Sequence, residues 1–213
     1  MIGFQYFSDL HLERYVNTFP KIKQIADNLI LAGDIGHPET EIYNEFFSYY
    51  SKKYENIYLV HGNHEVSFLD KQKINEKKFT EKNIHLLNNN FFIHKNKILI
   101  AGSILWTPKV NTIENTKSIH FLHDMVENSQ YQKKIFITHH LPSYELIVKK
   151  YHQLPYKKYQ DRYANHLDYL MRKKQSPQVW ICGHSHSVVK KKIHNTMCYI
   201  NTFGPTCDSK FEI

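Results

Sequence analysis

The strongest constraint on the fold of this chain is a pattern that occurs five times, a short apolar run that ends in polar residues. The apolar runs lie at about residues 2–7, 28–31, 56–60, 134–138 and 178–182. Their length and their content of Ile, Val, Phe and Tyr are typical of buried strands, and several of the segments between them are long enough to form helices. The sequence therefore predicts an α/β fold, arranged as a single domain over residues 1–213.

Helix and hairpin patterns fill the chain between these strands. Helices are expected at about 20–27, 38–53, 70–82, 113–131 and 161–174. Residues 91–94 and 98–103 predict a hairpin with a polar turn between its strands. Residues 143–160 contain four tyrosines and several lysines without clear periodicity, and they predict a mobile loop or a small cap over the strand ends.

The polar residues that follow the strands are of the types that bind metals. They are Asp9, His11, Asp34, Asn63, His64, His139, His140, His184 and His186. Such residues, just beyond the carboxyl ends of strands, lie where open α/β sheets bind ligands. In any one segment ordinary turn chemistry is an equally good explanation, but five segments of this kind are hard to explain by turns alone.

The kinds of side chain in this set narrow the choice of metal. The set contains carboxylates, imidazoles and one amide but no thiol, which suits Mn, Fe, Ni or Zn and not a structural zinc site built from cysteines. It is too large for one tetrahedral ion and suits two ions that share a carboxylate. Asp9 and His11 alternate with two leucines, so in extended geometry their side chains would point the same way.

The five segments, in this order, resemble the signature of the calcineurin-like metallophosphoesterases. The family pattern D-x-H, G-D-x-x, G-N-H-[DE], H and G-H-x-H is present here as Asp9-Leu10-His11, Gly33-Asp34-Ile35-Gly36, Gly62-Asn63-His64-Glu65, His139 and Gly183-His184-Ser185-His186. The resemblance spans almost the whole chain. It implies a two-sheet β-sandwich flanked by helices, in four layers, with the site at the carboxyl ends of the strands.

The resemblance also implies which residues hold which ion. The ligands of one divalent ion would be Asp9, His11 and His186, and those of the other would be Asn63, His139 and His184. Asp34 would bridge the two ions and so be part of the catalytic centre. Mn is the expected metal, with Fe, Zn or Ni as alternatives.

The same resemblance implies a reaction. A hydroxide that bridges the two ions would attack phosphorus, because two dications lower the pKa of water and neutralise phosphate oxygens. His64 would contact the phosphate and protonate the leaving group, a step typically worth ~10²–10⁴-fold in rate. Asn63 would also touch the substrate. His140 matches no ligand position, and it would either line the pocket or support the ligands.

Departures from the family pattern bear on the substrate. The Ser/Thr protein phosphatases of this family have arginines near the positions of Gly36 and Glu65, whereas this chain has Gly36-His37-Pro38 and Val66-Ser67-Phe68 there. Because Arg clamps a phosphomonoester dianion, its absence favours a phosphodiester or a small phosphorylated metabolite. The alternatives are a phosphomonoesterase, a nuclease or a catalytically silent protein-binding scaffold. The Tyr-rich segment could stack on a nucleotide base or could equally be ordinary packing.

Composition limits the partners and the compartment. The formal net charge is +8, but all except three of the 28 basic residues are lysines, so a nucleic acid is a possible partner without a sign of base-specific recognition. No apolar run is long enough for a membrane span, and the first residues lack the basic start of a signal peptide. Three cysteines without paired spacing indicate a reducing, cytoplasmic setting. The expected substrate is a phosphorylated small molecule or a nucleotide, and the oligomeric state stays open.

Overall fold

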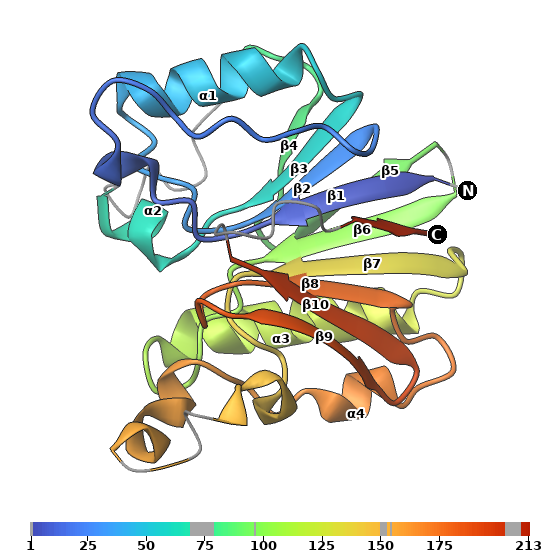
Figure 1. The fold of residues 1–213 in the computed structure, drawn as a ribbon. Coiled ribbons are helices and arrows are strands. Elements are labelled where there is room, and N and C mark those ends of the chain that lie inside the picture. Colours follow the sequence, from blue (N-terminus) through green and yellow to red (C-terminus); the bar gives the residue numbers. More distant parts are fainter. Residues whose placement is uncertain (1, 69–78, 96, 150–152, 154, 203–209) are drawn as a thin grey trace.

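Two β-sheets lie face to face at the centre of the protein, with helices on both outer sides (Figure 1). This computed structural model describes residues 2–68, 79–95, 97–149, 153, 155–202 and 210–213. The helices are α1 (Glu41–Ser51), α2 (Asn63–Phe68), α3 (Thr112–Glu127) and α4 (Asp168–Met171). Short 3₁₀ helices are η1 (Leu12–Arg14), η2 (Tyr144–Leu146) and η4 (Tyr156–Arg162).

The first sheet has five strands in the order β11-β1-β2-β3-β4. Their bounds are β1 (Gly3–Phe7), β2 (Asn28–Ala32), β3 (Asn56–Val60), β4 (Ile84–Leu86) and β11 (Lys210–Glu212). Strands β1 to β4 are parallel, and only β11 runs antiparallel to its neighbour β1. The carboxyl ends of β1, β2 and β3 therefore meet at one edge of this sheet.

The second sheet has six strands in the order β5-β6-β7-β8-β10-β9. Their bounds are β5 (Asn90–His94), β6 (Ile98–Ser103), β7 (Lys133–Thr138), β8 (Val179–Cys182), β9 (Val188–Ile193) and β10 (Thr196–Asn201). The four inner strands are parallel, and β5 and β9 are antiparallel edge strands. A bridge between Ser8 and Thr202 joins the ends of the two sheets.

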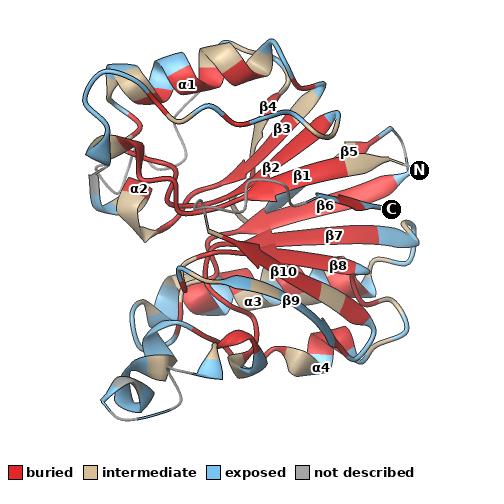
Figure 2. Ribbon diagram, in the orientation of Figure 1, coloured by how far each residue is buried: buried red, intermediate tan, exposed pale blue. Residues whose placement is uncertain are grey.

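Three apolar layers hold the sandwich together. The strands of both sheets are mostly buried (Figure 2). One lies between the sheets and includes Ile30, Ile100 and Ile181. A second packs α1 against the first sheet, and a third packs α3 and α4 against the second. Strands with both faces covered are apolar throughout, which explains why the runs in the sequence are continuous instead of alternating. The predicted four-layer sandwich is thus confirmed.

The elements predicted from sequence are found with small shifts where periodicity is strong. The structure contains the five predicted strands and the hairpin, which is formed by β5 and β6. It also contains the helices predicted at 38–53 and 113–131, which are α1 and α3. The helix expected at 70–82 lies mostly outside the described residues, and 79–82 are not helical. Among the described residues, no helix is both long enough and apolar enough to cross a membrane.

Two predicted helices are wrong in whole or in part. Residues 20–27 are not helical, because the Gln5 side chain donates to Lys23 O at 2.9 Å and accepts from Ile25 N at 3.0 Å, which holds this backbone open along β1. The helix expected at 161–174 is reduced to α4. Ahead of it the chain pairs with the segment after β7 through a bridge between Leu141 and Ala164, which is incompatible with a helix there.

Candidate metal centre

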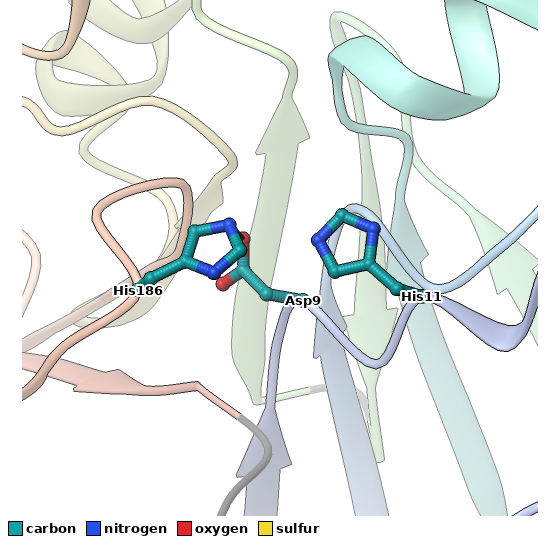
Figure 3. A group of neighbouring side chains, drawn as sticks. All are labelled: Asp9, His11 and His186. Atoms are coloured by element: carbon teal, nitrogen blue, oxygen red, sulfur yellow. Dashed lines mark ion pairs between the residues drawn. The ribbon is translucent and has the colours of Figure 1, made fainter. Parts of the chain in front are cut away.

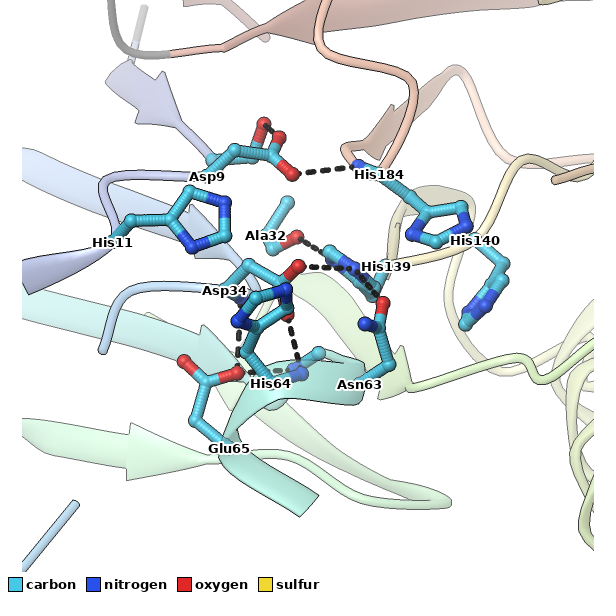
Figure 4. A network of polar contacts seen from close by, with 12 residues as sticks. Asp9, His11, Ala32, Asp34, Asn63, His64, Glu65, His139, His140 and His184 are labelled. Atoms are coloured by element: carbon cyan, nitrogen blue, oxygen red, sulfur yellow. Dashed lines mark hydrogen bonds and ion pairs between the residues drawn. The ribbon is translucent and has the colours of Figure 1, made fainter. Parts of the chain in front are cut away.

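The polar residues beyond β1, β2, β3, β7 and β8 gather in one place between the two sheets' carboxyl ends (Figure 4). Three groups of ligand-type side chains occur among the described residues, and within each group the candidate ligand atoms lie within 4.8 Å of one another. Two of these groups share Asp34, and two share His11. The seven residues of these three groups therefore form one connected cluster.

The first group is Asp9, His11 and His186 (Figure 3). Asp9 is almost fully buried, and its Oδ1 accepts the backbone N–H of His184 at 3.1 Å and lies 3.6 Å from His186 Nε2. Its other oxygen accepts hydrogen bonds from Ser8 and Thr202. A carboxylate held in this way is oriented before any ligand binds.

The His11 ring is oriented for metal binding by a residue that the sequence analysis had given no role. His11 Nδ1 lies 2.9 Å from Glu13 Oε1, which assigns the ring proton to Nδ1 and leaves the lone pair on Nε2. His11 Nε2 is buried and has no hydrogen-bond partner among the described residues. A buried acceptor without a donor is costly unless something binds it, so this geometry fits a metal ion.

The second group is Asp34, His139 and His184. His139 is fully buried, and its Nδ1 lies 2.9 Å from Ala32 O, so that its Nε2 points at the other candidate ligands. This Nε2 lies 3.0 Å from Asn63 Oδ1 and 3.3 Å from Asp34 Oδ2. The amide oxygen, the carboxylate and the imidazole thus converge on one point (Figure 4).

The third group, His11, Asp34 and His64, connects the first two. The His64 backbone N–H donates to Asp34 Oδ1 at 2.9 Å, while its ring is 37% exposed and its Nδ1 lies 3.4 Å from Glu13 Oε1. The His11 and His64 rings are 4.5 Å apart. Glu13 therefore contacts both a candidate ligand and the candidate proton donor.

Five residues of the metal centre have the same strained backbone conformation. Left-handed φ angles between 46° and 64° occur at Asp9, His11, Asp34, His184 and His186. The extended geometry expected for the Asp9-Leu10-His11 segment is therefore wrong, although both side chains do reach the same group. Non-glycine residues adopt this conformation at a cost, and such residues cluster at functional sites.

Gly62 packs so closely against Asp34 that no side chain fits at its position. A Cβ on Gly62 would overlap Asp34 Oδ1 and would lie 2.6 Å from Asp34 N. Any side chain at this position would fill the space that the carboxylate occupies. Glycine is thus required at position 62, because a side chain there would collide with the Asp34 carboxylate.

A buried carboxylate, Glu65, holds the loop that carries Asp34. Its oxygens accept backbone N–H groups of Asp34 at 3.0 Å, Ile35 at 2.6 Å, Gly36 at 3.3 Å and Gly62 at 2.7 Å. Burial and the nearby charge of Asp34 raise the pKa of Glu65 to about 7, against the effect of these donors. Glu65 stands within the quoted motif, but sequence alone gave no sign of this role.

Asp34 and His139 form a buried ion pair that shifts the pKa of each group. Burial by itself raises the pKa of the Asp34 carboxyl, but the charge and hydrogen bond of His139 outweigh this and hold it well below its usual range. Burial by itself lowers the pKa of His139, but the Asp34 carboxylate outweighs this and raises it to about 9. At His184, burial and the charge of His139 lower the pKa to about 3, so this imidazole is neutral, the form that binds metals.

His140 lies behind the cluster and not in its opening. The residue is 1% exposed, its ring is 4.2 Å from that of His184, and its Nδ1 lies 3.3 Å from Ile104 O. Burial, followed by the neighbouring histidines, holds its pKa well below the usual range. Of the two roles expected from sequence, this position favours support of His184 over contact with a substrate.

A cavity of about 350 Å³ opens onto the cluster. It is lined by Asp34, Asn63, His64, Tyr159, Tyr163, His184, Ser185 and His186. Its volume lies within the range of small-molecule sites. The two tyrosines come from η4 and the residue after it, and Tyr163 lies outside the segment that sequence analysis expected to form the cap.

Comparison with known proteins identifies a family that matches most of the chain. Residues 6–188 match the calcineurin-like phosphoesterase family. An uncharacterized protein, L509 of Acanthamoeba polyphaga mimivirus, is 27% identical over 255 aligned positions, which cover 94% of this chain and 90% of that protein.

Solved structures share the fold at low sequence identity. The phosphopantetheinyl hydrolase PptH of Mycobacterium tuberculosis matches with a TM-score of 0.64 at 14% identity, over 95% of this chain and 89% of its own. The calcineurin-like phosphoesterase YfkN of Bacillus subtilis matches with a TM-score of 0.56 at 12% identity, over 93% of this chain and 80% of the other. At such identities the likeness establishes the fold alone.

Proposed function

The chain belongs to the calcineurin-like phosphoesterase family, and on that premise we propose that it is a dinuclear metal-dependent phosphohydrolase that cleaves phosphodiesters. The observation that carries this proposal is the position of Asp34, whose carboxylate lies within 4.8 Å of a ligand atom of His11 from the first group and of His139 in the second. One acidic residue between two such groups is the arrangement that two-metal hydrolytic sites require.

The proposed ligands follow from the groups. Asp9, His11 and His186 hold one ion, and Asn63, His139 and His184 hold the other, with Asp34 between them. The unpaired Nε2 of His11 and the neutral imidazole of His184 support this division. Two divalent ions, with Mn favoured, would supply the charge that makes water nucleophilic near neutral pH and that offsets the charge on phosphate oxygens.

His64 is the proposed catalytic acid. Glu13 lies on the Nδ1 side of its ring, so Nε2 is the atom that would donate a proton to the departing oxygen. His64 is the more exposed of the two histidines that Glu13 contacts, and it lines the cavity where the ester would lie. Glu13 orients the ring through its contact with Nδ1 and is a positioning residue in this scheme.

The preference for diesters rests on the charge of the cavity wall. No Lys or Arg is among the described residues that line it, so no guanidinium is placed to clamp a monoester dianion. A diester carries a single negative charge and needs less neutralisation. The proposed substrate is therefore a phosphodiester, with a phosphorylated small molecule or a nucleotide as its chemical class.

Hydrolysis of two artificial esters tests this function. The metal-free protein, without and with added Mn²⁺, is assayed on bis-p-nitrophenyl phosphate and on p-nitrophenyl phosphate. Activity restored by Mn²⁺ with a preference for the diester is expected. A preference for the monoester would replace the proposal by a phosphomonoesterase, and two bound ions without activity on either ester would favour the silent scaffold.

The nuclease alternative has its own observation, the net charge of +8. Binding to polynucleotide that weakens steeply with salt, together with cleavage of it, would favour this alternative. We place the activity in the cytoplasm, because Cys182 and Cys198 are free and buried thiols, which suits a reducing compartment.

A further inference from the structure

Two tyrosine rings form one wall of the cavity at the metal centre. Tyr159 lies in η4 and Tyr163 directly follows it, and both line the cavity together with Asp34 and His64. Each tyrosine is 40% exposed, so much of each residue's surface is not used in packing. Isolated exposed aromatic side chains are common, but two in the wall of one concave polar site offer a surface for a ligand.

The position of Tyr163 is fixed by contacts with the metal centre's own framework. Tyr163 O accepts the N–H of Leu141 at 3.0 Å, and Leu141 lies only two residues after His139. The Tyr163 ring centroid is 4.9 Å from that of His184, and the carbonyl of Arg162 hydrogen-bonds the His184 ring. An aromatic side chain held in place before binding loses little conformational entropy when a ligand stacks on it.

Two positively charged side chains lie beside the Tyr159 ring. Lys158 Nζ lies 4.9 Å from the Tyr159 ring centroid, and the Arg162 guanidinium lies 5.6 Å from it. The one carboxylate of η4, Asp161, accepts a hydrogen bond from Tyr144 Oη at 2.8 Å. These cations contact the Tyr159 ring and do not line the cavity. Aromatic rings with cations beside them are typical of surfaces that stack on nucleobases.

We propose that Tyr159 and Tyr163 form a stacking surface for a nucleobase, so that this site selects phosphoesters of nucleosides over those of simple sugars and alcohols. The proposal rests on the proposed function, because it assumes that the phosphate lies beside Asp34 and His64. It assigns the base to the tyrosine wall of the same cavity and makes these two residues determinants of specificity.

Equilibrium binding tests the proposal without depending on turnover. Calorimetry on the Mn²⁺-loaded protein compares adenosine 5′-monophosphate with methyl β-D-ribofuranoside 5-phosphate, in which a methoxy group replaces the base at C1′. The ratio of their dissociation constants reports on the base alone, and stacking predicts that the nucleotide binds about 5- to 150-fold more tightly. Tyr159→Ala and Tyr163→Ala should bring this ratio toward one, whereas Tyr159→Phe and Tyr163→Phe should keep it.

Tyr169→Ala is the matched control, because Tyr169 is similarly exposed but lies on α4 and does not line the cavity. It should leave the ratio unchanged. A ratio near one in the unmodified protein, or a ratio that survives both alanine variants, would overturn the proposal. Hydrolysis of bis-p-nitrophenyl phosphate is measured in the same preparations. Absence of this activity would count against the proposed phosphohydrolase function, whereas base stacking is judged from the ratio of dissociation constants.

Discussion

Glu65 Oε2 accepts the backbone N–H of Asp34 at 3.0 Å, so a buried carboxylate fixes the loop that presents the central acidic residue of the metal centre. The same side chain accepts three further N–H groups, from Ile35, Gly36 and Gly62. Asp34 has a left-handed backbone with a φ of 54°, a conformation that costs energy in a residue with a side chain. Glu65 offsets this cost by satisfying the amides of the strained turn.

Replacement of this carboxylate should destabilise the protein and loosen the centre. In Glu65→Gln one oxygen becomes an amide nitrogen, so at least one of the four buried N–H groups loses its acceptor. Each such loss typically costs ~1–3 kcal/mol in the free energy of unfolding. Urea denaturation should therefore show a lower stability, whereas Glu45→Gln, at an exposed position on α1, should have little effect. Equal stability of the two variants would contradict this role.

Asp34→Asn should disrupt both proposed ion sites at once, since the Asp34 carboxylate lies within 4.8 Å of a ligand atom of His11 on one side and of His139 on the other. The substitution keeps the size of the side chain and removes its charge. We expect the metal content to fall from two ions to one or none, with affinity losses beyond the ~10–100-fold typical for residues that only support a ligand.

Metal content measured by mass spectrometry, together with hydrolysis of bis-p-nitrophenyl phosphate, checks this expectation. Asp124→Asn on α3 is the control, because its side chain is 77% exposed and it lies in none of the ligand groups. A fully active Asp34→Asn protein that still binds two ions would rule out the bridging assignment.

His64→Ala should separate metal binding from proton donation. The variant should keep both ions and lose ~10²–10⁴-fold in rate on an alkyl phosphodiester. The loss should be smaller on a p-nitrophenyl ester, whose leaving group departs without a proton. His120→Ala, at an exposed position on α3, serves as the control. Equal losses on both esters would argue against His64 as the acid, and loss of a metal would instead make it a ligand.

The fold could be predicted because its signals are local. Apolar runs such as Ile57–Val60 record burial on both faces of a strand, and the ligand-type residues stand directly after them. Strand ends of a parallel sheet meet at one edge, so convergence of these residues could be inferred without knowing which strands pair. The division into two sheets rested on the family resemblance, and the order of the strands within each sheet was not predicted.

The roles of residues that contact distant parts of the chain could not be predicted from the sequence. The role of Glu65 depends on backbone amides that lie about 30 positions earlier in the chain. The role of Tyr163 depends on its contact with His184. Asp9 and His11 do lie in one group, but a left-handed turn places them there and not the alternation of a strand. Backbone hydrogen bonds to Gly33 O and Asp34 O set that turn, and neither bond could be inferred from residue spacing.

The ion pair of His139 with Asp34 predicts how pH affects the metal-free protein. Against the effect of burial, the Asp34 carboxylate raises the pKa of His139 from its usual value of 6.5 to about 9 in the folded state. A raised pKa contributes stability that is fully present below about 6.5 and is lost as the pH rises through about 9. Urea denaturation of the metal-free protein should show this loss, of the order of 1 kcal/mol per pH unit across the window. His139→Asn should lack it, and His120→Asn should retain it.

Metal binding should show the opposite dependence on pH. His139 must give up its proton from Nε2 to become a ligand, so the ion competes with that proton at every pH below about 9. The affinity for Mn²⁺ should therefore rise by up to about tenfold per pH unit between pH 7 and pH 9 and level off above. Titrations against a competing chelator give this slope, and calorimetry in two buffers of different ionisation enthalpy counts the released proton. An affinity that does not change over this range, with no proton released, would mean that the ion does not displace a proton from His139.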